Sequence, residues 1–344
     1  METPEWHEPG CYEVADGVFR IPLPLPNDAL KAVNTYVIVD DNRLVMVDSG
    51  QYLEVAMRAL KAGLSHLGAE FGDIERFLIT HIHRDHYTQA VPLRREYGMK
   101  ISLGSIEKES LGHAQTRTGN PLTSQFEVIE RAGAKALLSK LLKEPNEEGI
   151  SGQLYEPPDD WLNEGQVLDL ATRRLRVIHT PGHTMGHVVF DDPENGLLFS
   201  GDHILPHITP SIGFEPVVTD NPLGSFLSSL RRVRRLRDAR LLPAHGDVLP
   251  GFHGRIDELI NHHDIRLGES LAALGTGAAT VWDVASELTW TRRRRLLHEL
   301  DPFNQMLAVM ETKFHLDLLV AQERAQLDDS GELYLYSLPN DKRR

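Results

Sequence analysis

The chain contains a single cysteine, Cys11, among its 344 residues. An intramolecular disulfide needs two cysteines and a cysteine-rich metal site needs more, so both are excluded. No apolar run approaches the roughly 18 residues that cross a bilayer. The first ten residues, METPEWHEPG, lack the basic stretch and apolar run of a signal peptide. These absences predict a cytoplasmic protein that does not enter a membrane.

Positive charge is also scarce, since 36 lysines and arginines face 50 acidic residues, a net charge of −14. An acidic chain repels phosphate backbones overall, so a nucleic-acid partner is unlikely on these grounds. The apolar share of 41% and the charged share of 25% are ordinary for a globular protein. The length allows one large domain with a smaller one attached.

The first part of the chain alternates between strand and helix patterns. Paired apolar runs predict a β-hairpin, apolar residues at helical spacing predict helices, and a short β-rich run predicts a buried strand. The segments are a hairpin at 36–50, a helix at 52–68, a strand at 74–80 and a helix at 91–98. This alternation predicts an α/β fold built in layers.

In the middle of the chain the alternating strand and helix patterns give way to helical patterns, and strand patterns then return. Residues 105–160 are expected to be a helical insertion that could lie over a site, and residues 122–144 within it read as an amphipathic helix. Strand patterns then follow at 175–192 and 196–202, a helix at 225–236 and another strand at 240–243. We therefore expect one catalytic domain over residues 1–252.

After residue 252 the sequence becomes mainly helical. Three helical segments, at 255–274, 280–290 and 305–327, precede a terminal hairpin at 328–339. This order suggests a small winged-helix-like domain over residues 253–344. We expect it to pack against the first domain, to shape the mouth of a site, or to make a homodimer.

The segment THIHRDH places several metal-binding side chains within six positions, as the motif HxHxDH. His81 and His83 are two apart on an extended segment and share a side, so both can reach one cation. Asp85 and His86 follow where the chain turns, and can address a second cation. Imidazole and carboxylate ligands suit Zn²⁺, and also iron or manganese.

Three later segments share a local form, an apolar strand that ends at a residue able to bind metal. They end at His183, Asp202 and His245. Strand ends gather at one edge of an α/β sandwich, so the seven residues can converge on two metals. The other histidines are expected to be surface or core residues, among them His187, His253, His262, His263, His298 and His315.

The motifs VDSG, THIHRDH, TPGHTMGH, SGDH and PAHG occur in this order between residues 47 and 246. In this order they resemble the metallo-β-lactamase superfamily. The resemblance implies a four-layer αββα sandwich with two metals at one edge. It implies that His81, His83 and His183 bind one metal, that Asp85, His86 and His245 bind the other, and that Asp202 bridges them. Asp48 would support a ligand imidazole from outside the metal shell.

A pair of cations a few ångströms apart lowers the pKa of a water between them and can polarise a substrate oxygen. The expected reaction is therefore metal-assisted hydrolysis, in which Asp85 could accept a proton. No side-chain nucleophile is needed, and Ser49 in VDSG reads as a turn residue.

Departures from the residue patterns of individual subfamilies narrow the range of possible substrates. The commonest zinc β-lactamases have a cysteine where this chain has Asp202, and the flavin-linked diiron members replace His83 with glutamate. The segment after SGDH and the tail resemble the glyoxalase II-related, lactamase-like branch. We expect hydrolysis of a small-molecule thioester, ester or lactone, with His207 as a possible substrate contact.

Other functions stay open at this point. A phosphodiesterase or endoribonuclease would use Arg231, Arg232, Arg234 and Arg235, or Arg292 to Arg295, against phosphates; spacing makes these runs look like solvated helix faces. A sulfur dioxygenase with a single iron uses overlapping residues, although the second ligand set is complete here. A non-catalytic relative would have lost some of the metal-binding residues, and none of the seven is missing from this sequence.

Overall fold

A computed structural model describes residues 5–26, 28–116, 122–143, 152–215, 217, 219–275, 277–291 and 293–339. The chain forms two compact units. Unit 1 comprises Met1–Arg117, Ile150–Pro210 and Phe226–Asp257, and unit 2 comprises Thr118–Gly149, Ser211–Ser225 and Glu258–Arg344. No helix within the described ranges is both long and apolar enough to cross a membrane.

Unit 1 begins with a seven-stranded sheet in which neighbouring strands are consecutive in the chain. Its strands are β1 (Tyr12–Ala15), β2 (Val18–Pro24), β3 (Ala32–Asp40), β4 (Arg43–Val47), β5 (Ile74–Ile79), β6 (Lys100–Gly104) and β7 (Asp160–Leu162). Pairing is antiparallel from β1 to β4 and parallel from β4 to β7. The expected hairpin is confirmed, because Asp40 pairs with Arg43 across the turn.

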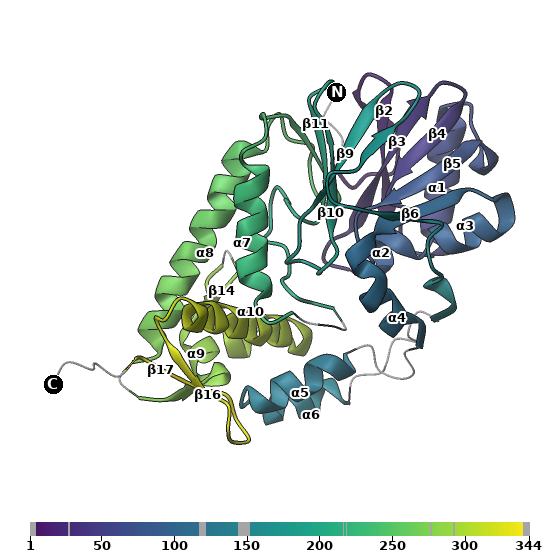
Figure 1. Ribbon diagram of the computed structural model, residues 1–344. Helices are drawn as coiled ribbons and strands as arrows, with labels where there is room; N and C mark the ends of the chain where they lie inside the picture. Colours follow the sequence, from purple (N-terminus) through teal and green to yellow (C-terminus); the bar gives the residue numbers. More distant parts are fainter. Residues whose placement is uncertain are drawn as a thin grey trace. The chain divides into compact units, whose positions relative to one another are not determined.

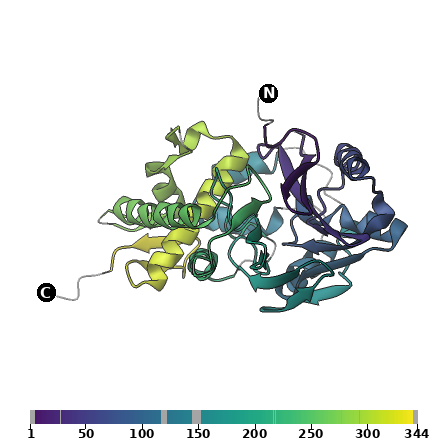
Figure 2. The ribbon, with the colours of Figure 1, turned by 90° about the horizontal axis from the view of Figure 1, so that it is seen from above.

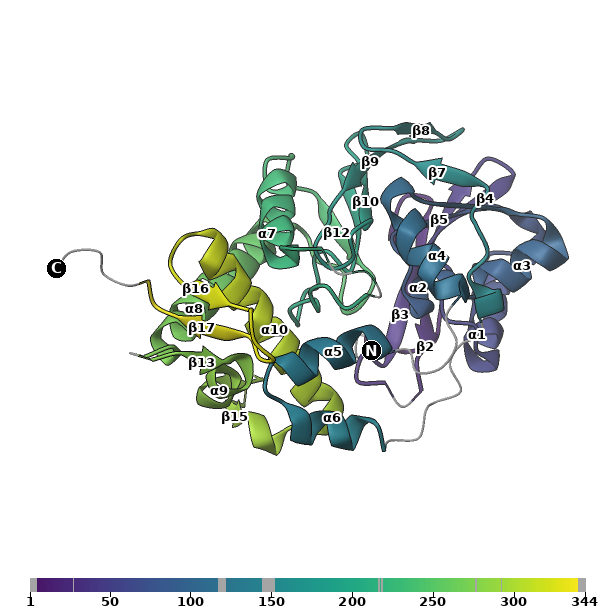
Figure 3. The same cartoon turned by 60° about the horizontal axis from the view of Figure 1, so that its bottom comes forward.

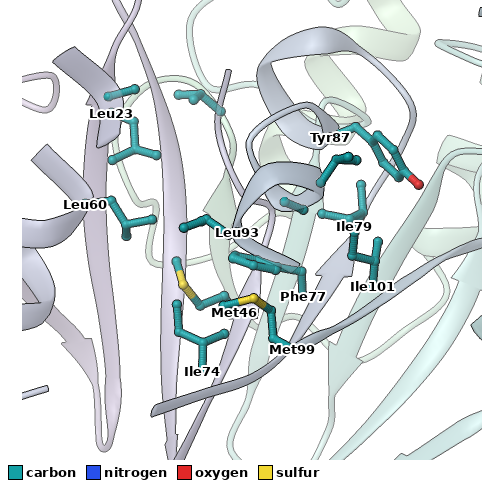
Figure 4. Packing of buried hydrophobic residues seen from close by; sticks show 14 of the residues in the cluster. Leu23, Met46, Leu60, Ile74, Phe77, Ile79, Tyr87, Leu93, Met99 and Ile101 are labelled. Atoms are coloured by element: carbon teal, nitrogen blue, oxygen red, sulfur yellow. The ribbon is translucent and has the colours of Figure 1, made fainter. Parts of the chain in front are cut away.

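Helices cover one face of this sheet, as Figure 1 shows for α1 (Glu54–His66) and α3 (Ala90–Tyr97). Residues on β4 alternate between two cores, with Met46 facing the helices and Val45 facing the opposite side. The helix-side core packs Met46 and Phe77 with side chains of both helices (Figure 4). This alternation is what a sheet buried on both faces requires.

The second sheet of unit 1 has the order β12-β11-β10-β9-β8. Its strands are β8 (Val167–Asp169), β9 (Arg174–His179), β10 (Val188–Asp192), β11 (Leu197–Gly201) and β12 (Arg240–Pro243). Its inner face packs on that of the first sheet, and Phe199 meets Tyr36 edge to face at 5.6 Å between ring centroids. Figure 2 shows the two sheets as separate layers.

Helix α7 (Pro222–Val233) lies beside the second sheet (Figures 1 and 3). Ser229 on this helix donates a hydrogen bond from Oγ to the Pro181 carbonyl at 3.0 Å. With α1 and α3 on the other side, the layers run helix, sheet, sheet, helix. The four-layer αββα sandwich expected from the motifs is confirmed.

Unit 2 combines helices with a small antiparallel sheet, visible in Figure 3. Its elements after α7 are α8 (His253–Ala273), whose first residues belong to unit 1, β13 (Ala279–Thr280), α9 (Val281–Glu287), β14 (Thr289–Trp290), β15 (Arg295–Leu296), α10 (Pro302–Ala321), β16 (Gln326–Asp328) and β17 (Leu335–Ser337). The sheet order is β13-β17-β16. This arrangement is consistent with the winged-helix-like expectation, although β13 was not anticipated.

The expectation of one helix over residues 122–144 is wrong. The described part forms α5 (Thr123–Arg131) and α6 (Lys135–Leu141), and residue 144 lies outside the described residues. The break falls at Gly133, whose φ of +87° suits glycine and whose absent Cβ would lie 3.0 Å from Thr280 Oγ1. Both helices pack on α10 within unit 2. The domain limits at residues 252 and 253 stay a prediction.

Two further short helices of unit 1 follow β5 in the chain, one before the predicted insertion and one within it. They are α2 (Arg84–Tyr87), which begins directly after His83, and α4 (Lys108–Thr116), which follows β6. Because α2 starts within the histidine motif, it turns Asp85 and His86 away from the direction of β5.

Candidate metal centre

The predicted metal-binding residues all follow the ends of strands in unit 1. His81 and His83 come after β5, His183 after β9, and His245 after β12, while Asp202 directly follows β11. Two sheets thus contribute to one cluster. All five are buried except His83, which is partly buried.

One group of possible ligands contains three imidazoles and a carboxylate. Nε2 of His183 lies 3.2 Å from Nε2 of His81 and 3.0 Å from Nδ1 of His83. Oδ2 of Asp202 lies 3.4 Å from the same His183 nitrogen. The four ligand atoms lie within 4.8 Å of one another, so one cation can reach them all.

A second group contains Asp85, His86 and His245. Oδ2 of Asp85 lies 3.6 Å from Nε2 of His86 and 3.4 Å from Nε2 of His245. Asp85 and His86 reach this group because α2 begins immediately before them.

Asp202 faces both groups with different oxygens. Its Oδ2 belongs to the first group, while its Oδ1 lies 3.6 Å from His86 Nε2 and 3.5 Å from His245 Nε2. A carboxylate oriented in this way can bridge two cations. The structure therefore brings together all seven residues that the sequence predicts as ligands.

Three buried atoms test whether this cluster fits metal ions. Nε2 of His86, Nε2 of His245 and Oδ1 of Asp202 are buried and make no hydrogen bond among the described residues. A buried polar atom without a partner costs free energy, yet these three converge on one point. Nitrogen and oxygen donors in this arrangement fit divalent cations, which satisfy all of them at once.

Hydrogen bonds behind the ligands set which imidazole nitrogen faces the centre. Nδ1 of His86 donates to Asp48 Oδ2 at 2.8 Å, and Nδ1 of His245 donates to the Ala32 carbonyl at 2.7 Å. Each ring thereby turns Nε2 inward, where it can offer its lone pair to a cation once the proton is displaced. Asp48 has a φ of +59°, and Thr80 donates to it through both its amide and its hydroxyl.

Sequence reasoning missed two residues that brace these loops. Thr80 Oγ1 lies between Asp48 and Nδ1 of His81, 3.1 Å from the latter. Asn34 on β3 donates through Nδ2 to the carbonyls of Pro243 and Gly246, on either side of His245. The available signal was a polar side chain inside an apolar strand, AVNTYVIV.

Glu107, also missed, is fully buried just after β6. Its Oε1 accepts a hydrogen bond from Thr184, the neighbour of His183, at 2.5 Å. Burial raises the pKa of this carboxyl to about 7, against the lowering effects of Thr184 and the Ile82 amide. Such a carboxyl is mostly protonated below about pH 7.

Charges in the cluster favour cations. Burial and the neighbouring imidazoles hold the pKa of His81 well below its usual value, which leaves it neutral and able to act as a ligand. Burial also disfavours charge on His86, but the carboxylates around it outweigh burial and raise its pKa to about 10. Burial raises the pKa of Asp85, and the nearby His86 and His245 lower it overall. Positive charge is thus stabilised at the second group.

Other predicted residues lie close by. His207 is exposed and its Nε2 lies 2.8 Å from Oδ2 of Asp247, two residues after His245. Ser49 donates from Oγ to the His86 carbonyl at 2.7 Å and accepts from the Ala90 amide, which matches a bracing turn residue. His187 is buried beside His81 and is not in either ligand group.

The arginine runs show the exposure expected of solvated faces. Arg231 and Arg235 are exposed, while Arg232 pairs with Glu164 and Arg234 with Asp257. Arg292 lies outside the described residues, and Arg293 to Arg295 are exposed.

The fold and this cluster define a metal-binding hydrolase of the metallo-β-lactamase type. The sequence model of the metallo-beta-lactamase superfamily matches residues 29–245, and the chain belongs to that superfamily.

Particular relatives agree. The chain is 26% identical over 320 residues to the probable metallo-hydrolase YqjP of Bacillus subtilis, covering 88% of this chain and 92% of that one. It is 27% identical over 267 residues to the lactamase-like protein adaB of Aspergillus niger, covering 77% and 66%.

Among solved structures, the metallo-beta-lactamase family protein TTHA1429 of Thermus thermophilus is similar with a TM-score of 0.73 and 29% identity, over 95% of this chain and 100% of that one. A beta-lactamase domain protein of Burkholderia ambifaria has a TM-score of 0.74 at 23% identity, over 96% and 95%, and supports the fold alone.

Proposed function

We propose that this hydrolase holds two divalent cations, of which Zn²⁺ suits the ligands best, and cleaves a small-molecule thioester, ester or lactone. The observation that carries the proposal is the orientation of Asp202, whose two oxygens face separate ligand groups. Cations bound there supply Lewis acidity and an activated water for attack on a carbonyl carbon.

The chain's own residues would divide the remaining work. His81, His83 and His183 hold one cation, Asp85, His86 and His245 hold the other, and Asp202 spans both. Asp85, whose Oδ2 belongs to the second group and lies 3.4 Å from Nε2 of His245, would accept a proton during attack. Asp48 keeps His86 in the tautomer that binds metal.

The residues exposed on the surrounding loops favour an organic substrate. Tyr52, Ile106 and Ile208 are 49%, 42% and 45% exposed, and Ile106 is the neighbour of Glu107, which bonds Thr184 beside His183. The Tyr52 amide donates to Thr88, two residues after His86, and Ile208 is the neighbour of His207. Exposed apolar side chains on segments connected to the ligands suit an acyl group better than a phosphate.

His207 would also contact the substrate. It is more than half exposed, and its ion pair with Asp247 holds it on the side of the His245 loop. From there a ring nitrogen could donate to a substrate carbonyl or carboxylate.

A hydrolysis screen on metal-loaded protein tests the proposal. Acyl-CoA and glutathione thioesters, aryl esters and lactones are compared with bis(p-nitrophenyl) phosphate and single-stranded RNA. We expect turnover of carbonyl substrates, lost in His83→Ala and kept in His298→Ala, which alters an exposed histidine outside both groups.

Preferential cleavage of the phosphodiester or RNA would overturn the substrate class. Metal analysis of the purified protein provides a separate check. One iron per chain, with oxygen-dependent oxidation of a persulfide, would contradict the two-cation hydrolase.

A further inference from the structure

His187 lies beside the metal centre without belonging to it. It immediately precedes β10, is fully buried, and its ring centroid lies 5.0 Å from that of His81 and 6.0 Å from that of His183. Proximity alone would suggest an additional ligand. The hydrogen bonds of the ring indicate a different role.

Both ring nitrogens of His187 are engaged by the protein. The backbone amide of Asp202 donates to Nε2 at 3.1 Å, and Nδ1 lies 2.8 Å from Oγ1 of Thr180. A backbone N–H can only donate, so Nε2 must carry a lone pair and the proton must be on Nδ1. Thr180 then accepts from Nδ1, and its hydroxyl points toward the His187 carbonyl at 3.4 Å.

The lone pair that a metal would need is therefore already used by the Asp202 amide. The Thr180 amide adds a bond to the His187 carbonyl at 2.7 Å, which ties the end of β9 to the start of β10. The ring is thus held in one orientation from both sides.

Gly201 makes this close approach possible. Its φ is +50°, and a Cβ there would lie 2.7 Å from Nε2 of His187 and 2.7 Å from Cβ of Thr80. Any larger residue would push the 201–202 peptide away from the imidazole. The turn after β11 is therefore shaped to bring the Asp202 amide onto His187.

The position of that amide determines where the Asp202 carboxylate points. Its two oxygens must each lie within about 3.5 Å of different imidazoles to serve both groups, as they do here. The side chain of Asp202 is short, so a shift of its backbone moves both oxygens together. A shift toward one group would favour one cation over the other.

We propose that His187 is a positioning residue that holds Asp202 between the two ligand groups, through a hydrogen bond to the Asp202 backbone amide. This role is independent of the substrate class proposed above, since it concerns only how the two cations are bound. Loss of a hydrogen bond that positions a metal ligand typically weakens metal binding by on the order of 10- to 100-fold.

Three variants at this position separate its contacts. His187→Gln retains an acceptor near the place of Nε2, His187→Asn retains only a donor near the place of Nδ1, and His187→Leu removes both. Thr180→Val removes the partner of Nδ1 and leaves the imidazole in place, which serves if a His187 variant fails to fold.

The measurement is the number of Co²⁺ ions bound per chain, their affinities by chelator competition, and the visible absorption spectrum of the Co²⁺-loaded protein. We expect His187→Leu and His187→Asn to bind the weaker ion at least 10-fold less tightly and to alter the spectrum. His187→Gln should restore both. Thr180→Val should show a smaller change in the same direction.

Equal behaviour of the Gln and Leu variants would overturn the proposal, because it would mean that the acceptor does not matter. An unchanged Co²⁺ stoichiometry and spectrum in folded His187→Leu would overturn it as well, and would reduce His187 to a packing residue. These readouts need no substrate, so they stand apart from the outcome of the hydrolysis screen.

Discussion

His86 donates a hydrogen bond from Nδ1 to Oδ2 of Asp48 at 2.8 Å, between two side chains that are both buried. Asp48 stands 38 positions earlier in the chain, at the end of β4, and adopts a φ of +59°. An L-residue other than glycine is uncommon in this conformation, and aspartate tolerates it better than most. The bond aims Nε2 of His86 at the second ligand group.

Replacing Asp48 with asparagine tests this relationship. Asparagine tolerates the same backbone conformation and has the same shape as aspartate. It lacks the negative charge of Asp48, and that charge orients His86 and makes its imidazole more basic. We expect the affinity of the second site to fall on the order of 10- to 100-fold and that of the first site to change little. Chelator competition with two resolved metal equivalents measures both.

Asp247→Asn is the matched control, because Asp247 lies beside His245 but pairs with exposed His207. Its metal affinities should equal those of the unaltered protein. Equal weakening of both sites in Asp48→Asn would contradict an action through His86 alone.

Metal should also stabilise the folded chain. The atoms of His86, His245 and Asp202 that lack partners are buried, and a cation that binds only the folded state adds RT ln(1 + [metal]/Kd) to its stability. At 100-fold excess over Kd this is about 2.7 kcal/mol per site. Thermal unfolding with increasing Zn²⁺ should show a rising Tm.

The double variant His83→Ala/His245→Ala removes one ligand from each group, so its Tm should not respond to Zn²⁺. A rise of the same size in this variant would assign the stabilisation to adventitious surface sites. A fall in Tm of the unaltered protein with metal would contradict the cluster as a metal centre.

The sequence alone was sufficient to predict most of the αββα sandwich and the positions of the seven metal ligands. The ligands follow strands, and an apolar run that ends in histidine or aspartate can be recognised in the sequence itself, as in RVIHTPGH and RLLPAH. The break at Gly133 was not predicted, because helical spacing continues across it, whereas the close approach of Thr280 that leaves little room for a Cβ is a feature of the fold. That contact joins residues far apart in the chain.

The residues behind the ligands could not be predicted for the same reason. Thr80, Asn34 and Glu107 act through contacts with side chains or carbonyls on other strands and loops. The family resemblance assigned His183 to the metal and left His187 among the ordinary surface or core histidines, since nothing in TPGHTMGH indicates that His187 accepts a hydrogen bond from the Asp202 amide. Only the fold shows that contact.

Glu107 provides a prediction for the pH dependence of stability. Its folded pKa of about 7 lies above the ordinary glutamate pKa of 4.5, because burial disfavours the carboxylate. The unfolded chain therefore releases this proton at lower pH than the folded one does. The contribution of protonated Glu107 to the free energy of unfolding is complete below about pH 4.5 and is lost as the pH rises to about 7.

Glu107→Gln cannot ionise and keeps an acceptor for Thr184. It should have a stability similar to that of the unaltered protein at pH 4.5 and exceed it by ~3 kcal/mol at pH 8, since each pKa unit corresponds to about 1.4 kcal/mol. Urea unfolding at both pH values measures the difference. Glu109→Gln, on the exposed side of the same segment, should show no such pH-dependent gain.

His315 on α10 gives the opposite dependence in unit 2. Burial lowers its pKa to about 4, Arg266 acts in the same direction, and its Nδ1 donates to the Glu311 carbonyl at 2.7 Å. The unfolded chain takes up this proton near pH 6.5, whereas the folded one resists it until about pH 4. The contribution of neutral His315 to the stability of α10 is therefore complete above pH 6.5 and is lost as the pH falls toward 4.

Amide hydrogen exchange of α10 at pH 7 and pH 5, corrected for the intrinsic exchange rates, measures this loss. The opening free energy should fall on acidification, and His315→Gln should remove ~2 kcal/mol of that fall because glutamine does not titrate in this range, whereas buried His263, whose pKa is also lowered, still contributes. His298→Gln alters an exposed histidine of the same unit and should leave the fall unchanged. If His315→Gln loses as much protection at pH 5 as the unaltered chain does, another group controls the acid sensitivity, and the neighbouring His263, 3.1 Å from His315, is the next to replace.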